Sequence, residues 1–332
     1  MIPNPLSNAR RKVLILGANG RFGLAAAQAF ARAGWDVVAQ VRRTPAAGMP
    51  ANARVVFAPI DDIDAVCGEA AGATVVVHAL NPAYTRWHTE LLPMARLGMD
   101  IAERLGARFA LPGNVYNFGA GMPARLVEGT PHQPTTRKGR LREQLESELR
   151  ARAPRLRSLV LRGGDFFGSG EGNWFDIAMV KDVARGRLAY PGSRTLTHAW
   201  AYLPDMAAAL AALCESSALP DVADIHFPGF ALTGDELLDA LEKAARALGV
   251  DAPQPLRRGG VPWGLMRAGA LVVPLWREVV EMRYLWETSH ALESRSFAAL
   301  APGFRATPLD AALRASLRAF VPGATAARAV AA

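Results

Sequence analysis

Residues 14–30, LILGANGRFGLAAAQAF, restrict the fold of this chain more tightly than any other stretch. An aliphatic run ends on Gly17, and Gly20 and Gly23 follow at three-residue intervals before an alanine-rich segment with helical spacing. A strand, a tight turn and a helix in this order direct backbone N–H groups and the positive end of the helix at one point. A Cβ atom at these glycines would block the approach of a phosphate group. The stretch therefore predicts a nucleotide-binding turn at the start of an α/β fold.

Beyond this turn, short aliphatic runs alternate with segments whose apolar residues recur at helical spacing. That rhythm is typical of parallel strands joined by helices that cover both faces of one sheet. We therefore predict an α/β fold, a Rossmann-type doubly wound parallel sheet with a smaller C-terminal substrate-covering lobe. The expected strands are residues 12–17, 35–41, 54–58, 74–79, 108–111 and 157–161, and the expected helices are residues 21–33, 61–70, 85–105, 135–153, 205–215, 234–248 and 309–320.

The rhythm loosens after residue 163, where glycines, aromatic residues and proline-bearing loops become frequent. We assign residues 1–163 to a nucleotide-binding domain and residues 164–332 to a mixed region that completes the sheet and forms the substrate lobe. With 51% hydrophobic and 20% charged residues in 332, the composition is that of a globular protein with a large core.

The net charge of +8, from 38 Lys+Arg against 30 Asp+Glu, raises the question of a nucleic-acid partner. The arginines are spread along the chain, and neither a basic tail nor a nucleic-acid-binding motif is present. The excess favours an anionic small ligand instead, and we expect no nucleic-acid partner.

Three features favour a cytoplasmic protein without a membrane partner. Cys67 and Cys214 lie in separate apolar segments without CxxC spacing, as expected of reduced thiols. The first residues contain no apolar run of the kind found in secretory signals. Residues 264–276, GLMRAGALVVPLW, are interrupted by an arginine and a proline and are shorter than the roughly 20 apolar residues that span a bilayer. We expect a buried or lid-like helix there.

Ordered landmarks along most of the chain extend the glycine pattern. They are GxxGxxG at 17–23, VVHALNP at 76–82, NVYNFG at 114–119, HAWAYLPDMAAAL at 198–210 and FALTGDELLDAL at 230–241. In these landmarks the chain resembles the extended, atypical short-chain dehydrogenase/reductase superfamily, the NAD(P)-dependent epimerase/dehydratase-like group. The resemblance implies a cofactor site formed by Gly17, Asn19, Gly20, Arg21, Phe22, Gly23, Ile60, Asp61, Asp62, His78, Ala79, Leu80, Asn81, Pro112, Gly113, Asn114 and Lys138.

The end of the second expected strand bears on the choice of nicotinamide cofactor. NAD sites usually place a carboxylate there, whereas this chain reads VRRTP, with Arg42 and Arg43 able to pair with a 2′-phosphate. NADP is therefore favoured over NAD, the alternative being that both arginines merely solvate the strand end. Asp62 matches the acid that the superfamily usually has near the adenine, although Asp61 or Asp62 could equally cap the next helix.

The superfamily's catalytic residues are replaced. Aligning its Tyr-x-x-x-Lys helix with PTTRKGRLREQLE, residues 134–146, puts Lys138 at the tyrosine, Arg142 at the lysine and Glu146 at the acid that often follows. Pro112 stands where the superfamily usually has serine or threonine. These departures put in doubt the usual mechanism, in which a tyrosinate stabilised by a lysine moves the proton that accompanies hydride transfer.

Three explanations stay open at this point. Lys138 could be the acid/base itself, with Arg142 one helical turn away lowering its pKa. Tyr116 could supply a phenol from the neighbouring loop while Lys138 binds the nicotinamide ribose. The chemistry could also be lost, leaving a solvated basic helix start and a fold that only senses the cofactor.

Polar and aromatic residues that follow the expected strands predict the substrate pocket. Ligands of open parallel sheets bind beyond the carboxyl ends of the strands, so these loops should meet at one crevice. His198 is a candidate general acid, although a lone histidine beside a tryptophan is more often structural. No spacing typical of a metal site occurs, so no metal is expected. The pocket candidates are Asn81, Tyr84, Trp87, Asn114, Tyr116, Asn117, Asp165, Phe166, Phe167, Trp174, His198 and Trp200.

The sequence thus predicts a cytoplasmic NADP-dependent oxidoreductase or epimerase-like enzyme that acts on a small carbonyl or sugar-nucleotide-type substrate. The aromatic residues between 163 and 200 suit a less polar carbonyl compound at least as well. The rival prediction is a non-catalytic NADP-sensing or scaffold protein that binds a partner through residues 265–276. Helices 85–105 and 135–153 are where the related fold often forms a homodimer.

Overall fold

The centre of the molecule is a seven-stranded sheet. The computed structural model describes residues 11–170, 172–253 and 255–321. The strand order is β11-β7-β5-β4-β1-β2-β3, and every neighbouring pair is parallel. The strands are β1 (Lys12–Leu16), β2 (Asp36–Gln40), β3 (Arg54–Val56), β4 (Val75–His78), β5 (Arg108–Gly113), β7 (Ser158–Arg162) and β11 (Val222–His226). The expectation of a Rossmann-type, doubly wound parallel sheet is confirmed.

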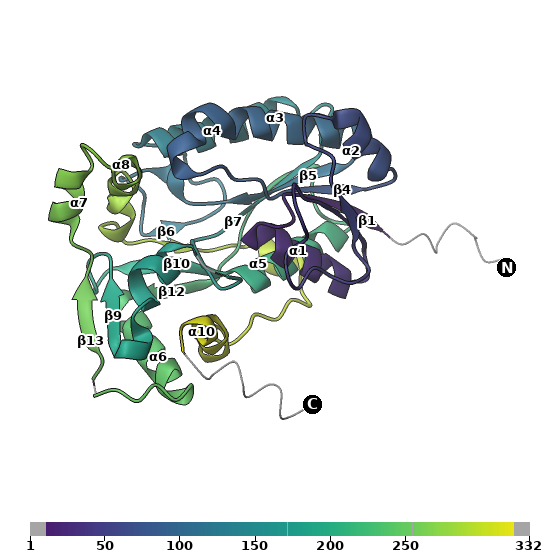
Figure 1. Cartoon of the computed structure of the whole chain (residues 1–332). Helices are drawn as coiled ribbons and strands as arrows, with labels where there is room; N and C mark the ends of the chain where they lie inside the picture. The colour runs from purple at the N-terminus through teal and green to yellow at the C-terminus, as the bar shows by residue number, and fades with distance from the viewer. Residues whose placement is uncertain (1–10, 171, 254, 322–332) are drawn as a thin grey trace.

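Helices cover both faces of this sheet (Figure 1). On one face lie α2 (Ile63–Glu69), α3 (Trp87–Leu105) and α4 (Arg137–Ala151), and on the other lie α1 (Arg21–Arg32) and α5 (Leu203–Glu215). Each face has its own core because side chains alternate along a strand. In β1, Val13 and Ile15 belong to the core beneath α1 and α5, whereas Leu14 and Leu16 belong to the core beneath α3.

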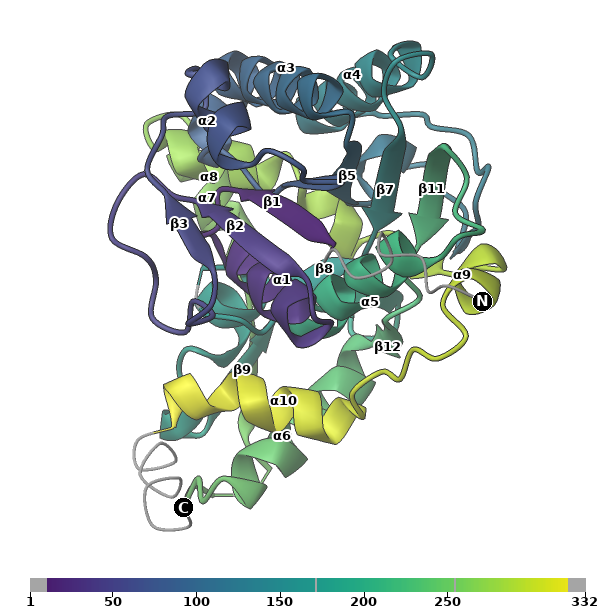
Figure 2. The same cartoon turned by 90° about the vertical axis from the view of Figure 1, so that its right-hand side faces the viewer.

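Later segments build a second, smaller layer below and beside the sheet, in which α6 and α10 pack side by side (Figures 1 and 2). A capping box between Thr233 and Glu236 begins α6. A third core lies in this layer. The strands and helices outside the seven-stranded sheet and the helices that cover it are β6 (Arg125–Leu126), β8 (Asp165–Phe167), a π-helix (Phe175–Val180), β9 (Arg187–Tyr190), β10 (Thr197–Tyr202), β12 (Phe230–Thr233), α6 (Gly234–Ala247), β13 (Arg257–Gly260), α7 (Trp263–Gly269), α8 (Pro274–Val280), β14 (Ala291–Leu292), α9 (Ser296–Leu300) and α10 (Leu309–Leu317).

The structure differs from the expectation of one buried or lid-like helix over residues 264–276. Pro274 lacks an N–H and begins a new helix, so the segment is divided into α7 and α8. Leu271 and Val272, in the turn between them, are 89% and 82% exposed, so this part is not buried. Among the described residues, no helix is long and apolar enough to cross a membrane.

Candidate active site

The glycine turn joins β1 to α1 in a conformation that only glycine accommodates well. Gly17 has φ of +78°, and Gly20 is the N-cap of α1. A Cβ atom on Gly23 would lie 2.3 Å from the carbonyl oxygen of Gly17, so the first turn of α1 packs directly on the loop. The loop therefore presents backbone and the N-terminus of a 12-residue helix, with Arg21 and Phe22 as its first side chains.

Hydrogen bonds of two side-chain carboxamides hold this turn in place. Asn19 donates from Nδ2 to the carbonyl oxygen of Thr44 at 2.9 Å, and its Oδ1 accepts from the N–H of Ala46 at 2.8 Å. Gln40, fully buried at the end of β2, accepts the N–H of Gly17 at 3.1 Å. Asn19 thus ties the glycine turn to the loop after β2, and this competes with its predicted contact to the cofactor. Gln40 was missed by the sequence analysis, because nothing local marks a glutamine as a brace.

The loop after β2 carries the two arginines predicted to select NADP. Arg42 and Arg43 are exposed, and neither forms an ion pair with any other residue that the structure describes. Asp62 caps α2, its Oδ1 accepting from the N–H of Ala65 at 3.0 Å. The cap alternative for Asp62 is therefore observed, and its second carboxylate oxygen is left for the predicted adenine contact. Asp61 is exposed beside it.

His78 ends β4, and its side chain packs against α3. A Cβ on Gly98 would lie 2.5 Å from Nδ1 of this imidazole, and the ring of Phe109 is 5.3 Å away between centroids. Burial lowers the pKa of His78 to about 3, so the ring is neutral. Its imidazole is enclosed by the sheet and α3, which leaves the main chain for the predicted cofactor contact. The side chain of Leu80, two residues later, lies next to Gly17 in the glycine turn.

Two tyrosines from separate loops meet beyond the carboxyl ends of β4 and β5. The phenolic oxygens of Tyr84 and Tyr116 are 2.8 Å apart and hydrogen-bonded. Trp87 packs on both rings, with centroid distances of 5.3 Å and 6.3 Å. Burial, with the charge of Asp165 adding to it, raises the pKa of Tyr84 to about 12 and that of Tyr116 well above 10. Both phenols are therefore protonated at neutral pH and can donate hydrogen bonds.

A carboxylate–imidazole pair joins β8 to β10. Oδ2 of Asp165 in β8 accepts a hydrogen bond from Nε2 of His198 in β10 at 2.9 Å. The imidazole of His198 stacks on Trp286 with 4.3 Å between centroids and contacts His290 at 4.5 Å. Burial and the neighbouring His198 lower the pKa of His290 to about 3. The second histidine is thus neutral, and Asp165 has His198 as its direct partner. The sequence analysis did not single out Trp286 or His290.

Comparison with known proteins identifies the fold. No protein-family model and no curated protein sequence matches the chain. Solved structures do match: a provisionally assigned epimerase from Burkholderia cenocepacia J2315 has 20% sequence identity and a TM-score of 0.72, covering 94% of this chain and 98% of its own. UDP-glucose 4-epimerase from Thermotoga maritima, solved with UDP-glucose, has 15% identity and a TM-score of 0.70 over 93% and 98% of the two chains. TunA, an NAD-dependent NDP-hexosamine 5,6-dehydratase, has 16% identity and a TM-score of 0.70 over 93% and 97%.

The chain has the fold of the epimerases and dehydratases. This agrees with the resemblance drawn from its landmarks, and at these identities the agreement concerns the fold. Within that fold, the helix expected to carry a tyrosine and a lysine is α4, which begins at Arg137 with Thr136 as its cap. Lys138 and Arg142, which replace that tyrosine and lysine, therefore lie in the first two turns of α4.

Lys138 is fully buried at the start of α4 and is enclosed by carboxylates. Its ammonium group contacts the carboxylate of Glu278 and lies 2.8 Å from that of Glu281, both contributed by the segment at α8. It also lies 5.2 Å from the centroid of the Tyr84 ring. Carboxylates contact the ammonium group, whereas the guanidinium of Arg142 binds the end of β5. The catalytic role of Lys138 stays a prediction.

The side chain of Arg142 binds the end of β5 and not the carboxylates that contact Lys138. Its Nη2 donates to the carbonyl oxygen of Pro112 at 2.8 Å, at the end of β5. Burial lowers the pKa of Arg142, and the charge of Glu146 opposes that effect. Arg142 therefore fixes the main chain that leads into the loop of Tyr116, while its own predicted part in catalysis stays untested.

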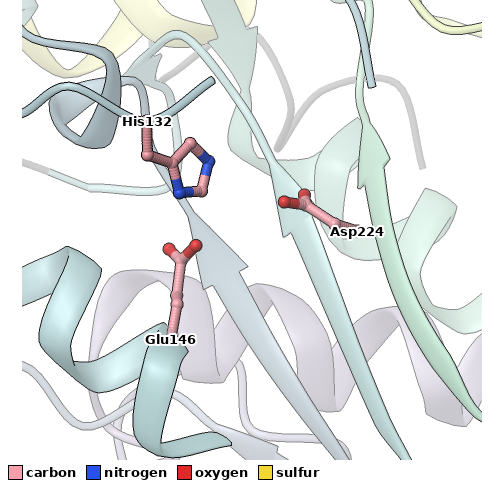
Figure 3. Close-up of side chains that lie close together, drawn as sticks. All are labelled: His132, Glu146 and Asp224. Atoms are coloured by element: carbon pink, nitrogen blue, oxygen red, sulfur yellow. The ribbon is translucent and has the colours of Figure 1, made fainter. Parts of the chain in front are cut away.

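Glu146 belongs to a buried ion-pair network behind β5 and β7. Arg162, fully buried, binds Glu146 at 2.8 Å and Asp224 at 2.7 Å, and donates to the carbonyl oxygen of Asn114 at 2.7 Å. His132, Glu146 and Asp224 point toward one another, with possible ligand atoms all within 4.8 Å (Figure 3). The guanidinium of Arg162 binds both carboxylates and Arg142 lies 4.0 Å from Glu146, so cationic side chains already pair with the carboxylates of this cluster.

Several predicted pocket residues are packing residues. Phe167 and Trp200 are each 1% exposed in the third core, so the expectation that they line a pocket is wrong. Phe166 packs on the first core. They were expected in the pocket because they follow the expected strands, but they lie in β8 and β10, which belong to a further small sheet. Asn117 is 0% exposed in the 3₁₀ turn after β5, where its amide donates to Glu143 at 3.1 Å, so its predicted place in the pocket is wrong as well. Asn81 and Asn114 lie in loops after the sheet strands, and Trp174 lies at the start of the π-helix.

Proposed function

We propose that the protein is an NADP-dependent oxidoreductase or epimerase-like enzyme that acts on a small carbonyl or sugar-nucleotide-type substrate. The observation that carries this proposal is the hydrogen-bonded pair of Tyr84 and Tyr116 beyond the ends of β4 and β5. Ligands of parallel sheets bind at that edge. The pair supplies a phenol within the fold of epimerases and dehydratases although the usual Tyr-x-x-x-Lys helix has none.

The cofactor part of the proposal depends on the glycine turn. Gly17, Gly20 and Gly23 leave backbone and a helix N-terminus without Cβ atoms at the turn, which fits a pyrophosphate. Arg42 and Arg43 fit a 2′-phosphate because they are exposed and lack a partner among the described residues. A bound nicotinamide would exchange a hydride with the substrate.

Replacing Arg42 and Arg43 together by glutamine tests the choice of cofactor. We expect the Kd for NADPH to rise by about 10- to 100-fold, because a hydrogen bond between charged groups contributes about 1.5–3 kcal/mol. The Kd for NADH should stay unchanged. Fluorescence titration of both cofactors measures the ratio, and Arg32→Gln at the far end of α1 is the matched control. An unchanged preference would show that the arginines only solvate the loop.

We assign the role of proton donor to Tyr116. Its raised pKa favours a protonated phenol that donates to a substrate carbonyl oxygen as hydride arrives, and Tyr84 is placed to return a proton to it through their hydrogen bond. Asp165 and His198 provide a second polar pair, which we propose orients the substrate. Arg142 holds the β5 end that positions the Tyr116 loop.

The non-catalytic reading is the second candidate, and one observation favours it. Lys138, the cation of the replaced catalytic helix, is enclosed by Glu278 and Glu281, so it has no free face for a ribose. Incubation of the protein with NADPH or NADP⁺ and a metabolite extract, followed by mass spectrometry, separates the candidates. A metabolite that changes only with the protein present supports an enzyme. Cofactor binding without any change supports a sensor.

Location and assembly belong to the same proposal. Cys67 and Cys214 are free cysteines in the structure, which suits the reducing cytoplasm. Pairing of two copies through α3 and α4 is proposed from the related fold, and sedimentation equilibrium tests it.

A further inference from the structure

Exposed apolar side chains gather on the α7–α8 segment, and α7 lies at the left-hand edge of the molecule in Figure 1. Leu271 and Val272, in the turn between the two helices, are 89% and 82% exposed, and Leu265 and Leu275 are 62% and 52% exposed. These four residues form the apolar tip. They are four of the seven large apolar side chains that are exposed in the described part of the chain. Single exposed apolar residues are normal, but such a concentration marks a surface that contacts a protein or a membrane.

The turn that carries the tip is held outward by contacts of its own. A Cβ atom on Gly269 would lie 2.3 Å from the ring of Trp276, so α7 and α8 touch at this point. The N–H groups of Val272 and Val273 donate to the carbonyl oxygen of Gly269 at 3.0 Å and 2.8 Å. The apolar tip is therefore already formed in the free protein, which lowers the cost of ordering it when it binds.

Positive charge accompanies the apolar tip. Arg267 in α7 and Arg277 in α8 are exposed, and neither forms an ion pair with another residue that the structure describes. The acids of this segment, Glu278 and Glu281, both contact the ammonium group of Lys138 and are therefore already paired. The segment thus carries unpaired positive charge, on a chain whose net charge is +8.

The combination of aliphatic side chains and arginines decides which occupant fits. Two copies of the chain that met through this tip would bring four arginines together, and like charges oppose such an interface. An anionic lipid bilayer complements both features, because aliphatic groups enter the boundary between headgroups and acyl chains while arginines stay at the headgroups. Helices α7 and α8 have seven residues each, far fewer than the roughly 20 that span a bilayer, so the contact is with the surface.

We propose that the apolar tip docks the protein onto an anionic membrane surface. Leu271 and Val272 insert below the lipid headgroups, and Arg267 and Arg277 bind the headgroup phosphates. The shortness of residues 264–276, from which no membrane partner was expected, excludes a span but is compatible with a surface contact. Docking does not depend on the proposed reaction, because it requires neither cofactor nor turnover.

Flotation of the full chain with lipid vesicles tests the proposal. We expect phosphatidylcholine vesicles that contain about one-third phosphatidylglycerol to bind the protein at least about tenfold more tightly than pure phosphatidylcholine, because each arginine near an anionic surface contributes about fivefold. Added salt should weaken binding to the anionic vesicles, since ions screen exposed charges.

Two exposed apolar residues are replaced to test the insertion. Leu271→Ser with Val272→Ser should weaken binding to the anionic vesicles by about tenfold or more, because both side chains leave water only when they insert. Both residues are exposed, so the fold does not depend on them. Phe57→Ser is the matched control, since Phe57 is 60% exposed directly after β3, outside the apolar tip.

Two arginines are replaced to test the charge. Arg267→Gln with Arg277→Gln should weaken binding to the anionic vesicles by about tenfold or more and leave binding to pure phosphatidylcholine unchanged. Arg32→Gln with Lys243→Gln removes the same net charge from exposed positions elsewhere, and this control should bind as the unaltered protein does.

The proposal is overturned if the protein does not bind anionic vesicles, or if the serine variant binds them as well as Phe57→Ser does. Equal binding by the two charge variants would also overturn it, because the attraction would then come from net charge and not from the tip. If vesicles do not bind and the serine variant converts a dimer into a monomer in analytical ultracentrifugation, the tip joins two copies of the chain instead.

Discussion

Tyr116→Phe is expected to lower kcat by about 10²- to 10⁴-fold, the usual contribution of a positioned acid or base. Substrate and NADPH affinities should change little, because the ring stays packed on Trp87 and only the hydroxyl group is removed. The measurement is steady-state turnover of the metabolite identified in the extract experiment. Tyr202→Phe removes a hydroxyl from a half-buried tyrosine outside the pair and serves as the control.

The pH profile gives this prediction a second readout. Burial and nearby negative charge hold Tyr116 and Tyr84 in the protonated form, the pKa of Tyr84 being about 12. The rate of carbonyl reduction should therefore show no break from phenol ionisation between pH 6 and about 10. A rate that rises through pH 7–9 and loses that rise in Tyr116→Phe would mean that the phenol acts as a base. Unchanged kcat in the variant would remove Tyr116 from the mechanism.

The parts of the fold that the sequence predicts correctly are those with local causes. Gly17, Gly20 and Gly23 predict the turn because glycine is needed there for local reasons. Either φ is positive or an atom a few residues away in the sequence lies too close for a Cβ. The alternation of strands and helices is local too, so a parallel sheet covered by helices on both faces follows from it. The division of residues 264–276 was less evident, since the start of α8 at Pro274 is a local signal but the exposure of the turn depends on what packs there.

The candidate site was predictable only in part, because its groups are joined across long sequence separations. Tyr84 was expected in the pocket and Tyr116 among the catalytic alternatives, yet their hydrogen bond depends on how two separate loops meet. Phe167 and Trp200 are core residues because a second layer covers them, and β8 and β10 alone do not reveal that layer.

Lys138 shows the same difficulty most clearly. Its charge suggested either a catalytic role or an exposed helix start. Both predictions used only the residues of its own helix. Its partners Glu278 and Glu281 come from α8 and its end, some 140 residues further on, and no spacing in the sequence connects them to α4. A buried ion pair is recognised from both partners at once, so only the assembled fold shows it.

Lys138→Met is expected to lower the free energy of unfolding by about 3–5 kcal/mol, the usual cost of removing one partner from a buried ion pair. Glu278 is buried, and although burial raises its pKa, hydrogen bonds from Lys138 and Arg137 hold that pKa below its usual value. Without the ammonium group, the carboxylate loses its main compensation. Urea denaturation followed by circular dichroism measures the change.

The double variant Lys138→Met with Glu278→Met decides what the pair contributes. Removing both charges should recover much of the lost stability, because replacing a buried ion pair by apolar side chains is often neutral. Arg54→Met, at the exposed pair of Arg54 and Glu69, should change stability little. If the double variant is as unstable as Lys138→Met, the pair is not what anchors α8 to α4. If it is stable and turns over normally, Lys138 is structural; if it is stable and inactive, Lys138 belongs to the catalytic machinery after all.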